Sequence, residues 1–531
     1  MIVFRADASD RMGTGHVRRC LTLAQALRAR GAQTHFVCRK HPGDLVAALR
    51  ENGQPVSTLP ALAARSAGAA DDSRAWLGVS AREDAEQTIA GLPDGVADWI
   101  VVDHYGIDHA WERLVSLHAG QLLVIDDLAN RPHDCDALLD QNYAEDGARR
   151  YRGLVPERCR VSIGPRFALL APEYARYREN QTARDGVVRH VLVYFGGSDP
   201  DNMTGRALEA LCAPEFSHLN VDLVIGTNSA HRTALEARAF ARPRTQVHGT
   251  RAHLADLMVR SDLAIGAGGG TTWERMCLGL PSVVVSIAEN QRPTNEALGA
   301  AGLIQYLGDV SAAGAAQIRD ALRGLVADRD RVKALSAESR RVVDGQGAAR
   351  VTDALLEPSG AVRIRTRHAL HAAATCPEGF GEFTFAWIDR CDPERVLALR
   401  NMPHVTSQMR TRDQISVAQH KAFLQGYPDL DRYDFVLIDN SRGGYAGVFY
   451  LTGVGATPEI GKYLGDQQYL GRGIARKATE RLLAFCRAKT HIHRLTSTTR
   501  RDNLRNIALN TGLGFTTVDA HDEYVVMALD L

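Results

Sequence analysis

A short apolar strand, a glycine-containing loop and a helix follow one another within the first 30 residues, and this order most constrains the fold. The strand is Ile2–Phe4, the loop carries Gly13 and Gly15, and His16 lies at the start of the helix. In α/β proteins such a loop presents unpaired backbone N–H groups to an anion. A histidine beside that anion can act as a base. The alternatives are a structural histidine and glycines that only form a tight turn.

Length and composition exclude several classes of protein. The 531 residues exceed a single hydrophobic core, so two or three domains are expected. A net charge of +1 provides no long-range field that would favour nucleic acid or an anionic membrane. The nine cysteines include no CxxC pair and no cluster with histidine, which predicts reduced thiols and no metal site. Neither a signal-peptide pattern nor an apolar run of about 20 residues is present, so we expect a cytoplasmic location.

Two series of apolar runs predict two tandem Rossmann-like domains, over residues 1–178 and 187–356. The expected strands include 34–37, 99–102 and 122–125 in the first domain, and 190–197, 221–226, 263–269 and 282–287 in the second. A helical segment over 315–356 is expected to close the second domain. Such a pair of domains binds its ligand in the cleft at the carboxyl ends of the strands.

Polar residues at the expected strand ends are candidates for that cleft. The second domain offers Gly196, Gly197 and Ser198 after one strand, and Gly268, Gly269, Gly270, Thr271 and Thr272 after another. Both groups precede a helix, which is typical of a phosphate or diphosphate site. The first domain offers Tyr105, the pair Asp126 and Asp127 with His133, and the pair Arg5 and Asp7. Packing, helix capping and an ordinary strand-end ion pair are the alternative roles for these side chains.

The character of the chain changes after residue 356. Residues 357–380 show no sustained periodicity and are interpreted as a linker. Residues 381–531 form a further α/β unit, with strands expected at 383–388, 434–439 and 446–451 and a helix at 393–401. The fold class predicted for the whole chain is therefore α/β, with two tandem Rossmann-like domains followed by a smaller α/β domain.

Six blocks in order along the chain resemble one enzyme family. They are RADAS with GTGH and RCLTLA, VVDHYGID (101–108), IDDLANRPHDCDALLDQN (125–142), YFGGSDPDN (194–202), GAGGGTTWE (266–274) and SIAENQ (286–291). Together they resemble the UDP-sugar hydrolase of pseudaminic acid biosynthesis, which removes UDP from a 2,4-diacetamido-trideoxy-altrose nucleotide. The resemblance covers about residues 1–355 and implies the GT-B fold.

This resemblance implies a role for individual residues. His16 would remove a proton from the attacking water, and the glycine loops would hold the UDP diphosphate without a metal. Either Glu274 or Glu289 is expected to accept hydrogen bonds from ribose hydroxyls, the other role being a helix cap. Asn290 and Gln291 are expected to line the sugar pocket.

The segment from Gln468 resembles the coenzyme-A-binding signature of GNAT acyltransferases. The signature residues are Gln468, Gly471, Arg472, Gly473, Ile474 and Ala475, and a helix to Lys489 follows. The glycines allow the backbone to approach a pyrophosphate, and the helix N-terminus offers it unpaired donors. Asn503 and the final GLGF match the second half of this family. Residues 400–424 resemble the nucleotide-sugar N-acetyltransferase of the same pathway, which implies acetyl-CoA as cosubstrate.

One position departs from that family. Many members have a tyrosine five residues before the final phenylalanine as general acid for the leaving thiolate, and here this position is Asn510. An amide cannot release a proton at neutral pH. Tyr463 and Tyr469 are near in sequence, but the motif assigns the role to neither. Glu459, His404 and His420 are candidates for the base that deprotonates the amine, or are surface and structural residues.

The sequence therefore predicts a bifunctional nucleotide-sugar enzyme whose partners are a UDP-amino sugar and acetyl-CoA. Acetylation of a 4-amino group would precede hydrolysis of the diacetamido nucleotide. One alternative is a GT-B glycosyltransferase fused to an N-acetyltransferase that acts on a related legionaminic- or bacillosamine-type sugar. The other is a UDP-sugar-binding sensor with a degenerate acetyltransferase.

Overall fold

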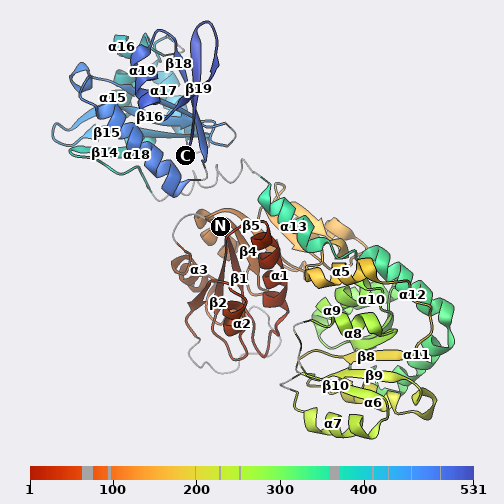
Figure 1. Ribbon diagram of the computed structural model, residues 1–531. Helices are drawn as coiled ribbons and strands as arrows, with labels where there is room; N and C mark the ends of the chain where they lie inside the picture. Colours follow the sequence, from red (N-terminus) through yellow and green to blue (C-terminus); the bar gives the residue numbers. More distant parts are fainter. Residues whose placement is uncertain are drawn as a thin grey trace.

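The computed structural model of the chain divides into three α/β units, each built on its own sheet (Figure 1). The structure describes residues 1–61, 76–93, 97–197, 199–226, 229–249, 251, 253–357, 370–371, 374–409, 412–427, 430–455, 457–490 and 492–531. The predicted linker thus falls mostly outside the described residues, as does Ser198.

The first sheet is entirely parallel and has the strand order β3-β2-β1-β4-β5-β6-β7. Its strands are β1 (Ile2–Ala6), β2 (Thr34–Arg39), β3 (Val56–Leu59), β4 (Ala97–Asp103), β5 (Ala119–Ile125), β6 (Ala137–Asp140) and β7 (Arg160–Ile163). The accompanying helices are α1 (Gly15–Ala29), α2 (Val46–Glu51), α3 (Ala81–Ala90) and α4 (His109–Val115). Every residue of β1 and β5 is buried, as expected for strands that helices cover on both faces.

The second sheet is also parallel, with the order β10-β9-β8-β11-β12-β13. Its strands are β8 (His190–Tyr194), β9 (Asn220–Val224), β10 (Thr245–His248), β11 (Leu263–Ala267), β12 (Ser282–Ser286) and β13 (Gln305–Asp309). The accompanying helices are α6 (Met203–Leu211), α7 (Arg232–Ala241), α8 (Ala255–Arg260), α9 (Gly270–Cys277), α10 (Arg292–Ala300), α11 (Ala315–Ala327) and α12 (Arg329–Val342). The two tandem Rossmann-like sheets predicted from the sequence are confirmed.

Two helices pack on the unit to which they do not belong in sequence. Helix α5 (Pro172–Asn180) belongs in sequence to the first unit, but its Tyr174 packs in the core of the second. Helix α13 (Gly347–Leu356) ends the second unit in sequence, yet Val351 and Leu355 lie in the core of the first. The Trp99 indole N–H also donates to the Leu355 carbonyl at 2.9 Å. The expected helical segment 315–356 is therefore three helices, of which the last packs on the first sheet.

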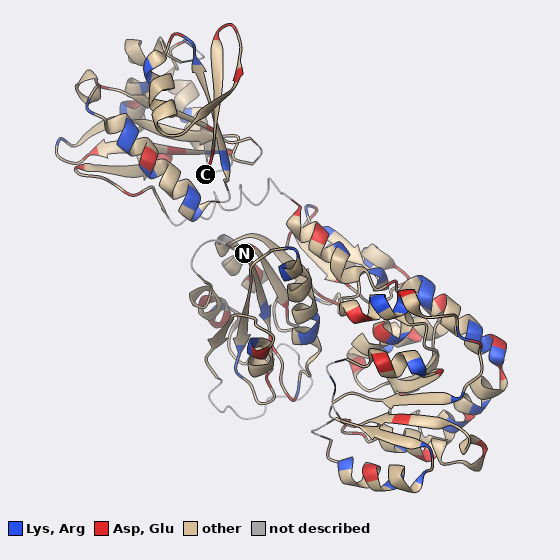
Figure 2. Cartoon of the chain, in the orientation of Figure 1, with Lys and Arg blue, Asp and Glu red and all other residues tan. Residues whose placement is uncertain are grey.

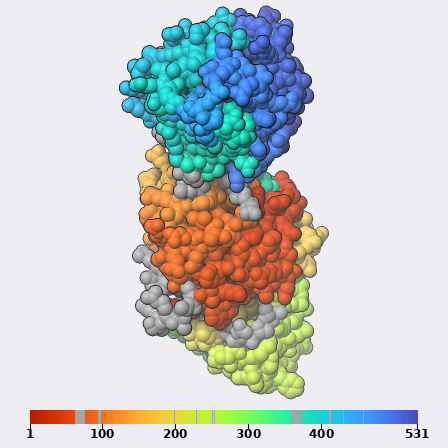
Figure 3. Space-filling view, turned by 90° about the vertical axis from the view of Figure 1, so that its left-hand side faces the viewer, coloured from red at the N-terminus to blue at the C-terminus, as the bar shows by residue number. Residues whose placement is uncertain are grey.

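The third unit has a mixed sheet in the order β14-β15-β16-β17-β18-β20-β19, in which, among the described strands, only the β17–β18 pair is parallel. Its strands are β14 (Phe383–Trp387), β15 (Arg432–Asp439), β16 (Gly444–Thr452), β17 (Glu459–Leu464), β18 (Arg494–Arg500), β19 (Thr516–Ala520) and β20 (Tyr524–Asp530). Its helices are α15 (Pro393–Arg400), α16 (Pro403–Thr406), α17 (Val417–Gly426), α18 (Ile474–Lys489) and α19 (Leu504–Gly512). In Figure 3 this unit, coloured from teal to blue, forms a lobe of its own above the red and orange first unit.

The surface carries charges of both signs. Figure 2 shows Lys and Arg interspersed with Asp and Glu along the helices of the second unit, in keeping with the net charge of +1. Within the described residues, we find no helix with the length and apolar character needed to cross a membrane. The nine cysteines are all free.

Candidate functional site

His16 and Asp103 meet at the point where the strand order of the first sheet reverses. The reversal lies between β1 and β4, and α/β sheets form their ligand crevice at the carboxyl ends of such strands. His16 follows β1 in the first turn of α1, whereas Asp103 is the last residue of β4. His16 Nδ1 and Asp103 Oδ1 are 2.6 Å apart, and both side chains are buried.

The carboxylate of Asp103 fixes the tautomer of His16. Burial by itself would raise the pKa of Asp103, but Arg19 and His16, through charge and hydrogen bonds, lower it well below its usual range. An ionised carboxylate only accepts hydrogen bonds, so Nδ1 of His16 carries the proton. The lone pair of the neutral ring is therefore on Nε2, where it can accept a proton from a substrate.

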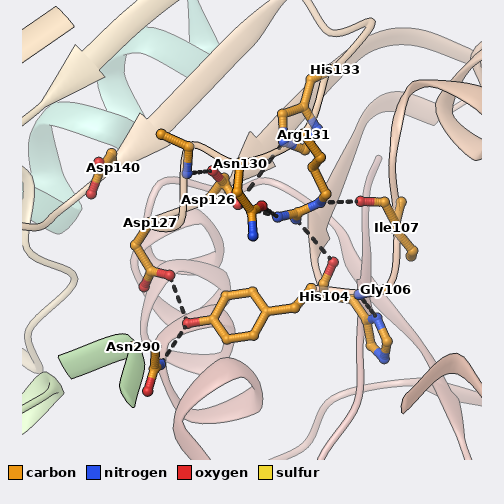
Figure 4. Close-up of polar contacts among 12 residues, drawn as sticks. His104, Gly106, Ile107, Asp126, Asp127, Asn130, Arg131, His133, Asp140 and Asn290 are labelled. Carbon is orange, nitrogen blue, oxygen red and sulfur yellow. Dashed lines mark hydrogen bonds and ion pairs between the residues drawn. The ribbon is translucent and has the colours of Figure 1, made fainter. Parts of the chain in front are cut away.

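Arg19 and Tyr105 extend the contacts of this pair towards the second unit. Arg19 binds Asp103 through Nε and Nη2, at 2.6 and 2.7 Å, and Asp127 through Nη1 at 3.0 Å. The Tyr105 hydroxyl donates to Asp127 at 2.6 Å and accepts from the Asn290 amide at 3.3 Å. Figure 4 shows Asp127 and Asn290 on either side of that hydroxyl. One polar chain thus runs from the base in the first unit to the loop after β12 in the second.

Other polar residues predicted at the strand ends of the first unit support the loops around this chain. Asp126 accepts from Arg131 at 2.7 Å (Figure 4) and from the Ala129 amide at 2.9 Å. His133 Nδ1 lies 2.6 Å from Glu112. Asp126 and His133 are both buried. Of the predicted acidic pair, only Asp127 faces the His16 site.

Arg5 and Asp7 belong to a buried ion-pair network. Arg5 binds Asp7 at 2.6 Å and Asp84 at 2.8 Å, and Arg39 binds Asp84 at 2.6 Å. None of these side chains is more than 1% exposed, which favours the structural alternative for the pair. The network holds the loop after β2 next to the end of β1, since the Arg39 amide also donates to Asp7.

The glycine loops of the second unit lie at the corresponding reversal of strand order, between β8 and β11. Gly196 has φ +101° and Gly269 has φ +90°, conformations that side chains disfavour. Gly269 is the N-cap of α9 and has no side chain, so it makes no capping hydrogen bond to the first amides of that helix. A Cβ atom on Gly268 would lie 2.2 Å from Asn295, whereas Gly196, Gly197 and Gly270 face open space.

The two threonines of this loop differ in their surroundings. Thr272 is buried and accepts a hydrogen bond from Arg275 at 3.1 Å. Thr271 is partly exposed, and its hydroxyl accepts from Arg275 at 3.3 Å. Arg275 also donates to the Ala267 carbonyl at 2.8 Å, so the threonine–arginine contacts fix the loop between β11 and α9.

The two glutamates proposed for ribose also differ. Burial raises the pKa of Glu274, against the Tyr174 hydrogen bond and the charges of Arg275 and Arg18 that favour its ionised form. Arg18 belongs to α1, so Glu274 faces the first unit. Glu289 is 84% exposed and pairs with Arg292 at 3.5 Å.

Asn290 and Gln291, in the short 3-10 helix Glu289–Gln291, connect the loops of the cleft. Asn290 reaches Tyr105, and Gln291 accepts from the Ile287 amide at 3.1 Å. Gln291 also lies beside Gly269, because a Cβ atom there would be 3.6 Å from its amide nitrogen. The residues predicted to line the sugar pocket thus lie between the His16 pair and the glycine loop.

The predicted coenzyme A signature forms the turn before α18. Gly471 and Gly473 both have φ +74°, and a Cβ atom on either would face open space. Gly473 is the N-cap of α18 and provides no side chain to its first amides. Gln468 is held by Asp466 and by Arg442 at the edge of this turn. The turn therefore directs free amides towards open space, as binding of a pyrophosphate requires.

The remaining signature residues have different surroundings. Arg472 is exposed, Ile474 is buried, and Ala475 is partly exposed in the first turn of α18. Asn503 caps α19 by accepting from the Asn506 amide at 3.1 Å, which is the structural role for this residue. Asn510 is completely buried, and its predicted contact with coenzyme A stays a prediction.

The candidate bases for the amine are dispersed. Glu459 accepts from the Thr498 amide at 3.1 Å and joins β17 to β18. His404 Nε2 lies 3.3 Å from the Leu464 carbonyl at the end of β17. Burial lowers the pKa of His420, which is stacked on Phe423 in α17. The contacts of these three residues do not single out a base.

The sequence reasoning missed two residues that contact each other beside His16 and one residue that contacts Asn510. Asp103 and Arg19 complete the surroundings of His16, and Lys462 donates a hydrogen bond to Asn510 at 2.8 Å. The position of Asp103 directly after the predicted strand 99–102, and that of Arg19 one helical turn after His16, were usable signals. Lys462 gave none, because its partner is 48 residues away in sequence.

Comparisons with known proteins relate the N-terminal and C-terminal parts of the chain to different proteins. Residues 377–516 match the acetyltransferase (GNAT) domain. The N-terminal part is similar to the spore coat polysaccharide biosynthesis protein SpsG of Bacillus subtilis, with 29% identity over 41% of this chain and 63% of that protein. It is also similar to the UDP-2,4-diacetamido-2,4,6-trideoxy-beta-L-altropyranose hydrolase of Campylobacter jejuni, with 26% identity over 55% of this chain and 94% of the hydrolase.

Among solved structures, the calicheamicin glycosyltransferase CalG4 is similar, with a TM-score of 0.45, 16% identity and coverage of 67% of this chain and 99% of that one.

Among the described residues, no three or more His, Cys, Asp and Glu side chains gather as metal ligands would. The arrangement thus offers an oriented histidine next to glycine loops in one part of the chain, and an anion-binding turn in the other.

Proposed function

We propose that this chain, which joins a part homologous to a nucleotide-sugar hydrolase to an acetyltransferase (GNAT) domain, catalyses two consecutive steps on one nucleotide sugar. The GNAT domain acetylates the 4-amino group of a UDP-4-amino-dideoxy sugar with acetyl-CoA. The N-terminal part then hydrolyses the UDP-2,4-diacetamido-2,4,6-trideoxy-altrose that results. The observation that carries the hydrolytic step is the His16–Asp103 pair, 2.6 Å apart at the strand reversal of the first sheet.

In the hydrolytic step His16 Nε2 accepts a proton from water as that water attacks the anomeric carbon. The bond from this carbon to the diphosphate oxygen breaks, and UDP leaves with the electron pair. Tyr105 and Asn290 orient the sugar between the two units, and Glu274 accepts hydrogen bonds from ribose. The amides at the start of α9 stabilise charge that grows on the diphosphate. UDP is already a good leaving group, so this step needs no separate acid.

In the acetylation step the amides of Gly471–Gly473 and the N-terminus of α18 hold the coenzyme A pyrophosphate. The sugar amine attacks the thioester carbonyl, the carbon–sulfur bond breaks, and coenzyme A leaves. Joining both activities in one chain raises the local concentration of the acetylated intermediate at the second site. Support for acetylation first and hydrolysis second comes from the similar hydrolase, which is named for a diacetamido nucleotide.

The direct test is mass spectrometry of the products formed from a panel of UDP-4-amino sugars with acetyl-CoA and water. We expect an acetylated nucleotide, followed by free diacetamido sugar and UDP. A reaction that stops at the acetylated nucleotide until an acceptor alcohol is added would identify a glycosyltransferase. No release of coenzyme A with any amino sugar in the panel would contradict the acetyltransferase assignment.

A further inference from the structure

The strands β17 and β18 are paired at only one position, where Glu459 lies opposite Thr496. Beyond this point β17 continues to Leu464 and β18 to Arg500 without further pairing to each other. Unpaired backbone groups between diverging strands need other partners, which an extended ligand can provide. Since β17 leads directly into the turn at Gly471–Gly473, a thioester whose pyrophosphate is bound at that turn can extend into this gap.

A short series of side-chain hydrogen bonds connects β17 to β18 across the same gap. Lys462, on β17, donates from Nζ to the Asn510 amide oxygen at 2.8 Å. The Asn510 amide nitrogen donates to the Ser497 hydroxyl, on β18, at 2.9 Å. The opposite orientation of the amide would set its NH₂ group against the ammonium, so this pair of contacts fixes it. Ser497 thus holds the amide nitrogen of Asn510, and the amide oxygen of Asn510 positions the ammonium of Lys462.

Asn510 occupies the position where many acetyltransferases of this family carry the tyrosine that protonates the thiolate. An amide side chain is shorter than a phenol and holds no acidic proton. The ammonium of Lys462, however, lies 2.8 Å beyond the amide oxygen of Asn510 and does hold acidic protons. Lys462, a proton donor on β17, therefore contacts the residue that stands in place of the tyrosine. We propose that Lys462 is the acid that protonates the coenzyme A thiolate in the acetylation step, an inference that rests on the proposed function.

The surroundings of Lys462 suit a proton donor at neutral pH. Burial lowers the pKa of Lys462 to about 8. The neighbours that the structure gives it among the described residues are uncharged: Asn510 from α19, Ser497 from β18 beyond it, and Phe449 opposite on β16. No carboxylate among the described residues forms an ion pair with it. A pKa near that of a free thiol, about 8.5, makes proton transfer to a thiolate nearly balanced.

The step balances without another reactant. The sugar amine adds to the thioester carbonyl carbon, and the tetrahedral intermediate expels sulfur with the electron pair of the carbon–sulfur bond. Lys462 Nζ gives a proton to that sulfur and becomes neutral. The new amide nitrogen loses its extra proton, which returns to Lys462 through water. The products are the acetamido sugar and coenzyme A as a thiol.

The test compares Lys462→Met and Lys462→Arg with the wild-type full chain. We expect Lys462→Met to lower kcat for acetylation about 100-fold or more, the usual contribution of a general acid. The wild-type rate should fall above about pH 8 as Lys462 deprotonates, and this alkaline limb should be absent in Lys462→Met. Lys462→Arg keeps the positive charge but not a transferable proton, so it should be as slow as Lys462→Met.

Three controls accompany these variants. Lys489→Met removes a lysine from the last turn of α18 and should leave acetylation unchanged. Coenzyme A affinity by calorimetry and UDP release from preacetylated nucleotide, measured on the same chains, should stay within about threefold. If the wild type acetylates no amino sugar, the proposed function fails. The role of Lys462 can then be tested on the slow hydrolysis of acetyl-CoA by water, because this reaction breaks the same carbon–sulfur bond.

Several results would overturn the proposal. Wild-type rates in Lys462→Arg would mean that charge alone is needed. An alkaline limb that persists in Lys462→Met would assign it to another group. Loss of coenzyme A affinity in Lys462→Met would make the lysine a binding or structural residue.

Discussion

Replacing Asp103 with asparagine tests whether His16 works as an oriented base. Asp103 accepts from His16 Nδ1 at 2.6 Å and from Arg19 at 2.6 and 2.7 Å. His16 Nδ1 and Arg19 Nη2 share Oδ1, whereas Arg19 Nε binds Oδ2, and an asparagine keeps only one of these two oxygens. When that oxygen serves Arg19 Nε, the amide NH₂ faces Nδ1, which must then accept, so the proton of the neutral ring moves to Nε2. His16 is left in place with its base lone pair directed away from water.

The expected loss follows from this change of tautomer. General-base catalysis contributes about 10²–10⁴-fold, so the rate of UDP release should fall by that factor. At 1.36 kcal/mol per tenfold, this raises the activation free energy by about 3–5 kcal/mol. Acetyl transfer by the same chain should be unaffected. The assay is UDP release from the diacetamido nucleotide, with thermal unfolding to check that the variant is folded. Asp353→Asn, in an exposed ion pair with Arg30, is the matched control and should change neither quantity measurably.

A double-mutant cycle separates orientation of His16 from a general structural role. His16→Asn by itself should abolish base catalysis, so Asp103→Asn added to it should cost little more. If the two losses multiply, Asp103 acts independently of His16 and the reasoning is refuted. It is also refuted if Asp103→Asn keeps more than about a tenth of wild-type UDP release, or if His16→Asn does.

Three further predictions concern other parts of the chain. Gly473→Val forces a side chain into φ +74° and into the space before α18, so calorimetry should show loss of acetyl-CoA binding while hydrolysis of preacetylated nucleotide persists. Burial by itself would raise the pKa of Asp222, but the hydrogen bonds and charges of His190, Arg260 and His248 lower it, so Asp222→Asn should cost about 3 kcal/mol of unfolding free energy at pH 7. This carboxylate is stabilised above its unfolded pKa of about 4, so the difference between the two proteins in pH-dependent unfolding should shrink as pH falls below 4, and a constant difference would count against it. A cut near residue 368 should yield two folded pieces that retain hydrolysis and acetylation separately, and joint loss of both activities would reveal an obligate interface.

The sequence by itself was sufficient for the order of the units and for most strands. Buried parallel strands are continuous apolar runs, so those at Thr34–Arg39 and Ser282–Ser286 were predicted within two residues of their ends. The glycines before α9 and α18 were also recognisable, because a positive φ before a helix restricts the residue type locally. These features depend on neighbours within a few positions along the chain.

Partners that are distant in sequence were decided only by the tertiary structure. Asp103 reaches His16 across 87 residues, Asn290 reaches Tyr105 across 185, and Lys462 reaches Asn510 across 48. The apolar stripe of α13 predicted a helix, but not that the helix would return to the first sheet. The physical reason is that periodicity reports which face of an element is buried, whereas the sheet order and the packing of the units select the side chain that it meets.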